Sequence, residues 1–184
     1  KTIEHMQQSD YGKHIFGYEI ASLGSEEWYH VGVNQQQLGD YSVHLERAFQ
    51  KWVRDKYQTR EKLESAWGKP GLDFDQVVIP SKQERMGDQE QTFRHPATDM
   101  NVIDFYVFYS EVVVDTIDYF ANIAKKTSGR KKVIGAFYDY MYELRGGPEF
   151  GHNAGGKLLH RTNIDVICAR PRYYERQLGT GAEA

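Results

Sequence analysis

Hydrophobic residues along this 184-residue chain occur in two arrangements, short continuous runs and longer stretches with helical spacing. The short runs predict buried strands, and they lie at 14–22, 133–140 and 164–169. Stretches whose apolar side chains recur every three or four residues predict helices, and they lie at 42–57, 59–67 and 101–126, with shorter helices before residue 12 and after Asn153. Apolar strands separated by helices are typical of parallel βαβ units, so the pattern predicts an α/β fold.

Residues that commonly begin and end helices flank the predicted helical segments. Ser42, Thr59 and Asp99 are each placed to cap the first turn of a helix, and Gly68 is placed to end one. Between Gly68 and residue 97 the chain carries three prolines and many charges without a clear period. A segment of this length inside one domain is usually functional or a mobile cover over a site.

The first predicted strand leads into a loop with two carboxylates and a tryptophan, Glu26, Glu27 and Trp28. Acids just past the carboxyl end of a strand, beside an aromatic ring, are a common way to build a sugar-cleaving site. The alternative is a surface loop in which the acids are solvated and Trp28 covers the core.

Acids, arginines and tyrosines follow all three predicted strands, and the carboxyl ends of parallel strands share one edge of a sheet. The residues expected to meet there are Glu26, Glu27 and Trp28, then Asp139, Tyr140, Tyr142, Glu143 and Arg145, then Arg170, Arg172, Tyr173 and Tyr174. Each has an ordinary alternative: Glu143 could pair with Arg145 at the surface, and Tyr173 could pack against a helix. Their convergence favours a functional site.

Composition narrows the choice of partner. A net charge of −3 gives no electrostatic reason to expect nucleic acid or an anionic membrane, and no apolar run reaches transmembrane length. The 13 Tyr, 9 Phe and 3 Trp suit stacking on sugar rings. The single cysteine, Cys168, excludes an internal disulfide and a multi-cysteine metal site, and its place in a strand predicts a buried apolar role. His152 either touches a ligand, caps the short helix that follows it or lies in a loop.

Two phrases in the helical region carry a family resemblance. They are Phe49-Gln-Lys-Trp-Val-Arg-Asp-Lys-Tyr57 and Leu63-Glu-Ser-Ala-Trp-Gly68. They resemble the "W-L-x-x-K-Y-G" and "L-N-x-A-W-G" phrases of family 42 glycoside hydrolases, the beta-galactosidase type. The stretches 17–29, 135–144 and 165–176 are similar to segments of an uncharacterised branch related to that family.

The resemblance implies a (β/α)8 TIM barrel, in which residues 1–184 form one partial catalytic domain with about strands four to six. It also implies a retaining mechanism, with an acid/base glutamate after strand four and a nucleophilic glutamate after strand seven. Glu27 matches the acid/base position best, because it lies beside Trp28. Glu26 is the alternative, because the family's typical Asn-Glu pair is absent. The nucleophile is expected beyond Ala184, and Trp28, Tyr138, Tyr140, Glu143, Arg170 and Tyr173 are expected to line the sugar site.

We therefore expect a fragment of a retaining hydrolase of β-glycosides, with β-galactosides as candidate substrates. The alternatives are a carbohydrate-binding barrel that has lost catalysis and a domain whose aromatic loops bind another protein. The expected partner is a carbohydrate, without nucleic acid, membrane, metal or other cofactor. Because a three-strand slice leaves open sheet edges, we expect it to need the rest of its parent chain, or self-association as a homo-oligomer. Alone, it is expected to be inactive.

Overall fold

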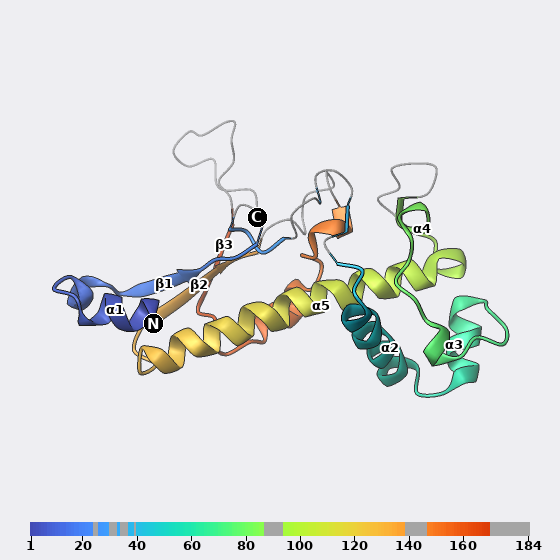
Figure 1. Ribbon diagram of the computed structural model, residues 1–184, viewed down its shortest axis with the longest axis horizontal. Helices are drawn as coiled ribbons and strands as arrows, with labels where there is room; N and C mark the ends of the chain where they lie inside the picture. The colour runs from blue at the N-terminus through green and yellow to red at the C-terminus, as the bar shows by residue number, and fades with distance from the viewer. Residues whose placement is uncertain are drawn as a thin grey trace.

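The computed structural model describes residues 1–23, 26–29, 33, 37–38, 40–86, 94–138 and 147–169 (Figure 1). The helices are α1 (Thr2–Gln8), α2 (Val43–Tyr57), α3 (Arg60–Trp67), α4 (Lys82–Met86), α5 (Pro96–Thr127) and α6 (Gly155–Leu159). The strands are β1 (Gly17–Ile20), β2 (Val133–Phe137) and β3 (Val166–Cys168). Short 3-10 helices lie at η1 (Gly12–His14), η3 (Phe74–Gln76) and η4 (Gly147–Phe150).

The three strands form one parallel sheet in the order β1-β2-β3. Gly17 lies opposite Val133, and Gly135 lies opposite Val166. The hydrogen bonding continues one residue past β2, because the Tyr138 N–H donates to the carbonyl of Cys168 at 3.0 Å. Each strand lies inside its predicted run and is shorter than it. Parallel strands with helices between them confirm the α/β class.

Helix α5 is 32 residues long and joins the sheet to the helical part of the molecule. Figure 1 shows the sheet alongside the C-terminal half of α5, with α2, α3 and α4 gathered near its N-terminal half. In the C-terminal half, Ala121 and Ala124 pack against Ile134 of β2. No helix in the described ranges is long and apolar enough to cross a membrane.

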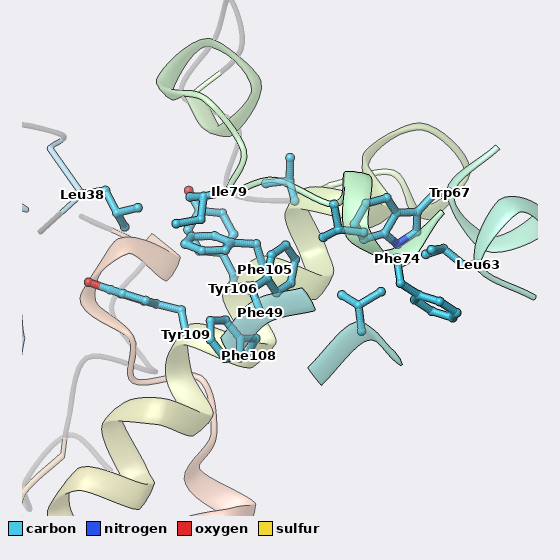
Figure 2. Packing of buried hydrophobic residues seen from close by; sticks show 13 residues of the cluster. Leu38, Phe49, Leu63, Trp67, Phe74, Ile79, Phe105, Tyr106, Phe108 and Tyr109 are labelled. Carbon is cyan, nitrogen blue, oxygen red and sulfur yellow. The ribbon is translucent and has the colours of Figure 1, made fainter. Parts of the chain in front are cut away.

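The N-terminal half of α5 contributes to the larger apolar cluster of the molecule (Figure 2). Phe49 of α2 lies at its centre, with its ring centroid 5.4 Å from that of Phe105 and 5.2 Å from that of Phe108. The buried members are Leu38, Phe49, Val53, Leu63, Trp67, Phe74, Val77, Ile79, Val102, Phe105, Tyr106, Phe108 and Tyr109. Aromatic rings in tilted and edge-on contact therefore fix α2 and α3 on α5.

The predicted starts of α2 and α3 are confirmed, and that of α5 is wrong. The Ser42 hydroxyl accepts from the Leu45 N–H at 3.2 Å, and the Thr59 hydroxyl accepts from the Lys62 N–H at 3.4 Å. Helix α5 begins at Pro96 after the N-cap residue His95, whereas we predicted a start at 101 after Asp99. Asp99 lies at a kink inside α5, where its carboxylate accepts from the His95 N–H at 3.1 Å. It therefore supports the same helix end from one turn further on.

The family-like phrases of the sequence converge on a buried carboxylate, that of Asp104 in α5, which has no exposed surface. One oxygen of Asp104 accepts from the Tyr57 hydroxyl at 2.6 Å and from the Trp67 indole N–H at 2.8 Å. The other accepts from the Lys56 ammonium at 2.6 Å. Lys56-Tyr57 and Ala66-Trp67-Gly68 are therefore structural phrases that fix α2 and α3 to α5.

The long proline-containing segment after Gly68 is well packed where the structure describes it. Phe74, Val77 and Ile79 are buried in the larger apolar cluster. Arg85 of α4 is also buried. Residues 87–93 lie outside the described ranges, so the mobile cover predicted for 68–97 does not apply to 68–86.

Candidate functional site at the carboxyl ends of the strands

The loop after β1 has an unusual backbone. Leu23, Glu26 and Trp28 all have positive φ angles, of 65°, 66° and 62°. Residues other than glycine rarely adopt this conformation, and such positions cluster at functional sites where the surroundings hold them in place. The Trp28 N–H donates back to the carbonyl of Ser22 at 3.1 Å and closes the turn. The loop therefore has a defined shape at the point where it carries Glu26 and Glu27.

Trp28 attaches this loop to the hydrophobic core. Its side chain is 1% exposed and packs against Val113, Ile117 and Leu158. Its indole N–H donates to the carbonyl of Ile20, the last residue of β1, at 3.0 Å. The ring that we predicted to line a sugar site therefore lies in the core.

The two glutamates on this loop differ in exposure. Glu26 is exposed and Glu27 is half-buried. Glu27 directly precedes the buried Trp28, so its backbone is held where the loop meets the core. A titrating side chain on a fixed backbone suits proton transfer better than one on a mobile loop.

Tyr138, which directly follows β2, is also 1% exposed. Its hydroxyl accepts from the Ala154 N–H at 2.9 Å and donates to the carbonyl of Gly151 at 3.4 Å. Burial raises the pKa of Tyr138, so its hydroxyl stays protonated. Tyr138 therefore fixes the segment between η4 and α6 beneath the loop after β1.

His152 lies in that segment, and its ring stacks on Tyr138 with centroids 4.3 Å apart and planes at 14°. The ring also forms hydrogen bonds to the backbone of Glu27 and Trp28. Burial lowers the pKa of His152 to about 4, so the imidazole is neutral at ordinary pH. His152 does not cap the following helix, since α6 has Ala154 as its N-cap, and it lies in the loop before that helix.

A second contact joins the same two segments. The rings of Tyr29 and Phe150 meet edge to face, with centroids 5.1 Å apart, and form a small buried cluster with Val33. Residues 149–152 therefore support the loop after β1 on both sides of Trp28.

A buried ionic network that the sequence did not indicate lies next to Phe150. Glu149, which is 5% exposed, contacts the Arg85 guanidinium, and one of its oxygens accepts from the Tyr106 hydroxyl at 2.6 Å. Arg85 also donates to the Tyr41 hydroxyl and, at 3.2 Å, to the carbonyl of Pro80. Burial and the Glu149 carboxylate raise the pKa of Tyr106, which therefore remains a donor. Partners this far apart in sequence leave no local signal that could have found them.

Cys168 lies in β3, as the sequence predicts, but its side chain is half-buried, whereas we predicted a buried one. Burial raises the pKa of its thiol, and the nearby Glu19 carboxylate raises it further. A thiol nucleophile needs the opposite shift. Among the residues that the structure describes, no three His, Cys, Asp or Glu side chains are grouped so that they could hold a metal ion.

Four of the residues predicted to line the sugar site lie outside the described ranges. They are Tyr140 and Glu143 after β2, and Arg170 and Tyr173 after β3. The other residues expected at these two strand ends also lie outside them, namely Asp139, Tyr142, Arg145, Arg172 and Tyr174. The structure brings together Glu27, Trp28 and Tyr138 through His152, whose part in this arrangement the sequence did not reveal.

Comparison with known proteins gives the family. A search of curated proteins finds no match to this chain. The family model Glyco_hydro_42, described as beta-galactosidase, matches residues 28–148. This region takes in α2, α3, α5 and β2, with Asp104 and its partners, and it begins one residue after Glu27. The match spans well over half of the sequence and agrees with the phrases that suggested the resemblance, so the chain belongs to glycoside hydrolase family 42, the beta-galactosidase family.

Proposed function

We propose that this chain is part of the catalytic domain of a retaining glycoside hydrolase that acts on β-glycosides, with β-galactosides as the first candidates. The observation that carries the proposal is the position of Glu27, on a fixed loop just past the carboxyl end of β1 in a parallel sheet. Family membership supports a carbohydrate as the substrate class. The acidic net charge and the abundant aromatic residues agree with a neutral sugar ligand.

The proposed architecture is a (β/α)8 barrel in which residues 1–184 form a single partial domain with about strands four to six. The sheet supports it, because its spatial order β1-β2-β3 is the order along the chain and both pairs are parallel. Barrels of this type are built from strands that follow one another in this way, with helices between them and the active site at the carboxyl ends.

In the proposed mechanism, Glu27 first acts as a general acid. Its carboxyl group protonates the glycosidic oxygen while a second carboxylate attacks the anomeric carbon, which breaks the bond to the leaving group. Glu27, now ionised, then takes a proton from a water molecule that attacks the glycosyl-enzyme ester and releases the sugar with its configuration retained. The second carboxylate is proposed to come from a later barrel strand, beyond residue 184.

The remaining site residues take two kinds of role in this proposal. Tyr140, Glu143, Arg170 and Tyr173 stay candidates for sugar contacts. Trp28 and Tyr138 are 1% exposed, and this burial argues against direct contact with a sugar. We propose that both side chains support the loop that carries Glu27 from its core side.

The test compares Glu27→Gln with Glu26→Gln in the full-length protein. With an alkyl β-galactoside, whose leaving group needs protonation, Glu27→Gln should lower kcat/KM by roughly a hundredfold or more. With a dinitrophenyl β-galactoside, which needs no acid, kcat/KM should change little. Glu26→Gln should leave both substrates nearly unaffected, and the reverse pattern would assign the role to Glu26.

A second candidate function is a carbohydrate-binding barrel without catalysis. The observation that favours it is that Glu26 precedes Glu27, whereas the resemblance implies an asparagine before the acid/base glutamate. Binding of galactosides by calorimetry, without turnover of the dinitrophenyl substrate, would support this candidate over the enzyme.

A further inference from the structure

His152 is placed to control the backbone of the loop that carries Glu27. Its ring is 1% exposed and forms hydrogen bonds to the backbone of both Glu27 and Trp28. Burial lowers the pKa of His152 and keeps the imidazole neutral, so the ring has one N–H, which it shares between the backbone groups of Trp28 and Glu27. Stacking on Tyr138 fixes the plane of the ring.

The loop needs such support because of its backbone. Glu26 and Trp28, on either side of Glu27, both have positive φ angles. Residues other than glycine adopt such angles only when the surrounding structure holds them there. The Trp28 indole fixes one end of this stretch to Ile20 of β1. His152 supplies a second attachment, directly at Glu27, from a segment more than a hundred residues away in sequence.

The histidine itself is held from two sides. Gly151 has a φ of +77°, and a side chain there would lie 2.9 Å from a methyl group of Val113, so the chain passes close against α5 just before His152. Phe150 packs on Tyr29, and the Tyr138 hydroxyl bridges Gly151 and Ala154. Tyr138 and α5 on one side, and the loop after β1 on the other, therefore set the position of the ring.

We propose that His152 is a positioning residue for the acid/base glutamate: by donating to the Glu27 backbone it holds the Glu27 carboxyl group where it can protonate the glycosidic oxygen. This inference rests on the proposed function of Glu27. A general acid must lie within hydrogen-bond reach of the leaving oxygen, and a displacement of about 1 Å is enough to slow the reaction roughly a hundredfold.

The experiment uses two variants in the full-length protein. His152→Phe keeps an aromatic ring on Tyr138 and removes the donor, whereas His152→Gln keeps an N–H donor. His160→Gln, at an exposed histidine next to α6, is the control. The measured quantity is kcat/KM for alkyl and dinitrophenyl β-galactosides, because only the alkyl leaving group needs the proton of Glu27.

We expect His152→Phe to lower kcat/KM for the alkyl substrate by roughly tenfold to a hundredfold and to leave the dinitrophenyl substrate within about threefold of wild type. His152→Gln should recover most of the loss. Equal losses on both substrates, or no rescue by glutamine, would overturn the inference, because a purely structural role is indifferent to the leaving group.

A readout independent of activity separates this inference from the function on which it rests. Amide hydrogen exchange of residues 20–29 should accelerate in His152→Phe, while exchange in α2 and α3 stays at wild-type rates. If the wild-type protein hydrolyses no glycoside but this acceleration occurs, the proposed function fails and the attachment of the loop stands. If exchange at 20–29 is unchanged, the positioning role fails whatever the activity.

Discussion

Asp104 of α5 stabilises the packing of three helices, because its hydrogen-bond partners lie in α2 and α3. Its buried carboxylate joins Tyr57, Trp67 and Lys56 across three helices. Burial and the bond to Asp104 raise the pKa of Tyr57, so that its hydroxyl remains a donor. In this chain the family-like phrases therefore pack helices α2 and α3 against α5.

Replacement of Asp104 should destabilise the protein strongly. Asp104→Ala leaves the Trp67 indole N–H and the Tyr57 hydroxyl without their acceptor and removes the partner of the exposed Lys56 ammonium, which costs about 2–4 kcal/mol of the free energy of unfolding. Asp55→Ala, in the exposed pair with Lys51, is the control and should change it by less than about 1 kcal/mol. Urea unfolding measures both, and similar small effects from the two variants would contradict the role given to Asp104.

His152 makes stability depend on pH in a defined direction. Its pKa is about 4 in the folded protein against an ordinary value of 6.5, so the folded state resists protonation that the unfolded state accepts. The contribution of the neutral His152 to the free energy of unfolding is therefore fully present above pH 6.5. It is lost as the pH drops from 6.5 towards 4, which lowers the free energy of unfolding by up to about 3 kcal/mol. The other titratable side chain stacked on the ring is Tyr138, which stays neutral over this range.

Thermal unfolding at a series of pH values measures this dependence. His152→Phe removes the titrating group, so the difference between wild type and variant should change between pH 6.5 and 4. His160→Gln should follow the wild type throughout. A constant difference between wild type and His152→Phe over that range would show that burial does not shift this pKa.

The residue that follows helix α2, Gln58, has a strained backbone. Gln58 has φ of 65° and ψ of −39°, a region that favours glycine, and the related family phrase carries glycine after its Lys-Tyr pair. Gln58→Gly should therefore raise the free energy of unfolding by about 1 kcal/mol, the relieved strain exceeding the added chain entropy. Gln58→Ala is the matched control, since it keeps the strain. Equal stability of the two variants, measured by thermal unfolding, would contradict the backbone strain assigned to Gln58.

The segment before α6 lies against α5 through Gly151. Its positive φ, and the 2.9 Å that would separate a new Cβ from Val113, predict that Gly151→Ala destabilises the protein by roughly 1–3 kcal/mol. Gly156, inside α6, has no atom within 4 Å of the position of a Cβ. Gly156→Ala should therefore be neutral or slightly stabilising. If chemical denaturation gave both variants wild-type stability, the close approach at Gly151 would be wrong.

Across the whole fold, the sequence predicted those features that local patterns determine. The three strands, the periodic helices and the caps at Ser42 and Thr59 follow from spacing and from short-range hydrogen bonds. The start of α5 was missed because Asp99 and His95 both carry capping groups, and the observed start depends on Pro96, which suits a first turn.

The sequence did not predict contacts between residues that lie far apart along the chain. Nothing near Arg85 indicates that it meets Glu149, and nothing near Glu27 indicates that His152 supports its backbone. Trp28 shows the same limit, because an aromatic beside two acids suits a sugar site and a core equally well. The described sheet ends at β1 and β3, and the expectation that it is completed by the parent chain or by self-association stays a prediction.

Azide rescue tests the central claim, that Glu27 is the acid/base of a retaining glycosidase, most directly. In full-length Glu27→Ala, a dinitrophenyl β-galactoside should still form the glycosyl-enzyme, and its slow release should be accelerated by azide, with β-galactosyl azide as the product. Glu26→Ala should give galactose at the wild-type rate and no azide product. Formation of the azide by Glu26→Ala alone, or by neither variant, would contradict the account.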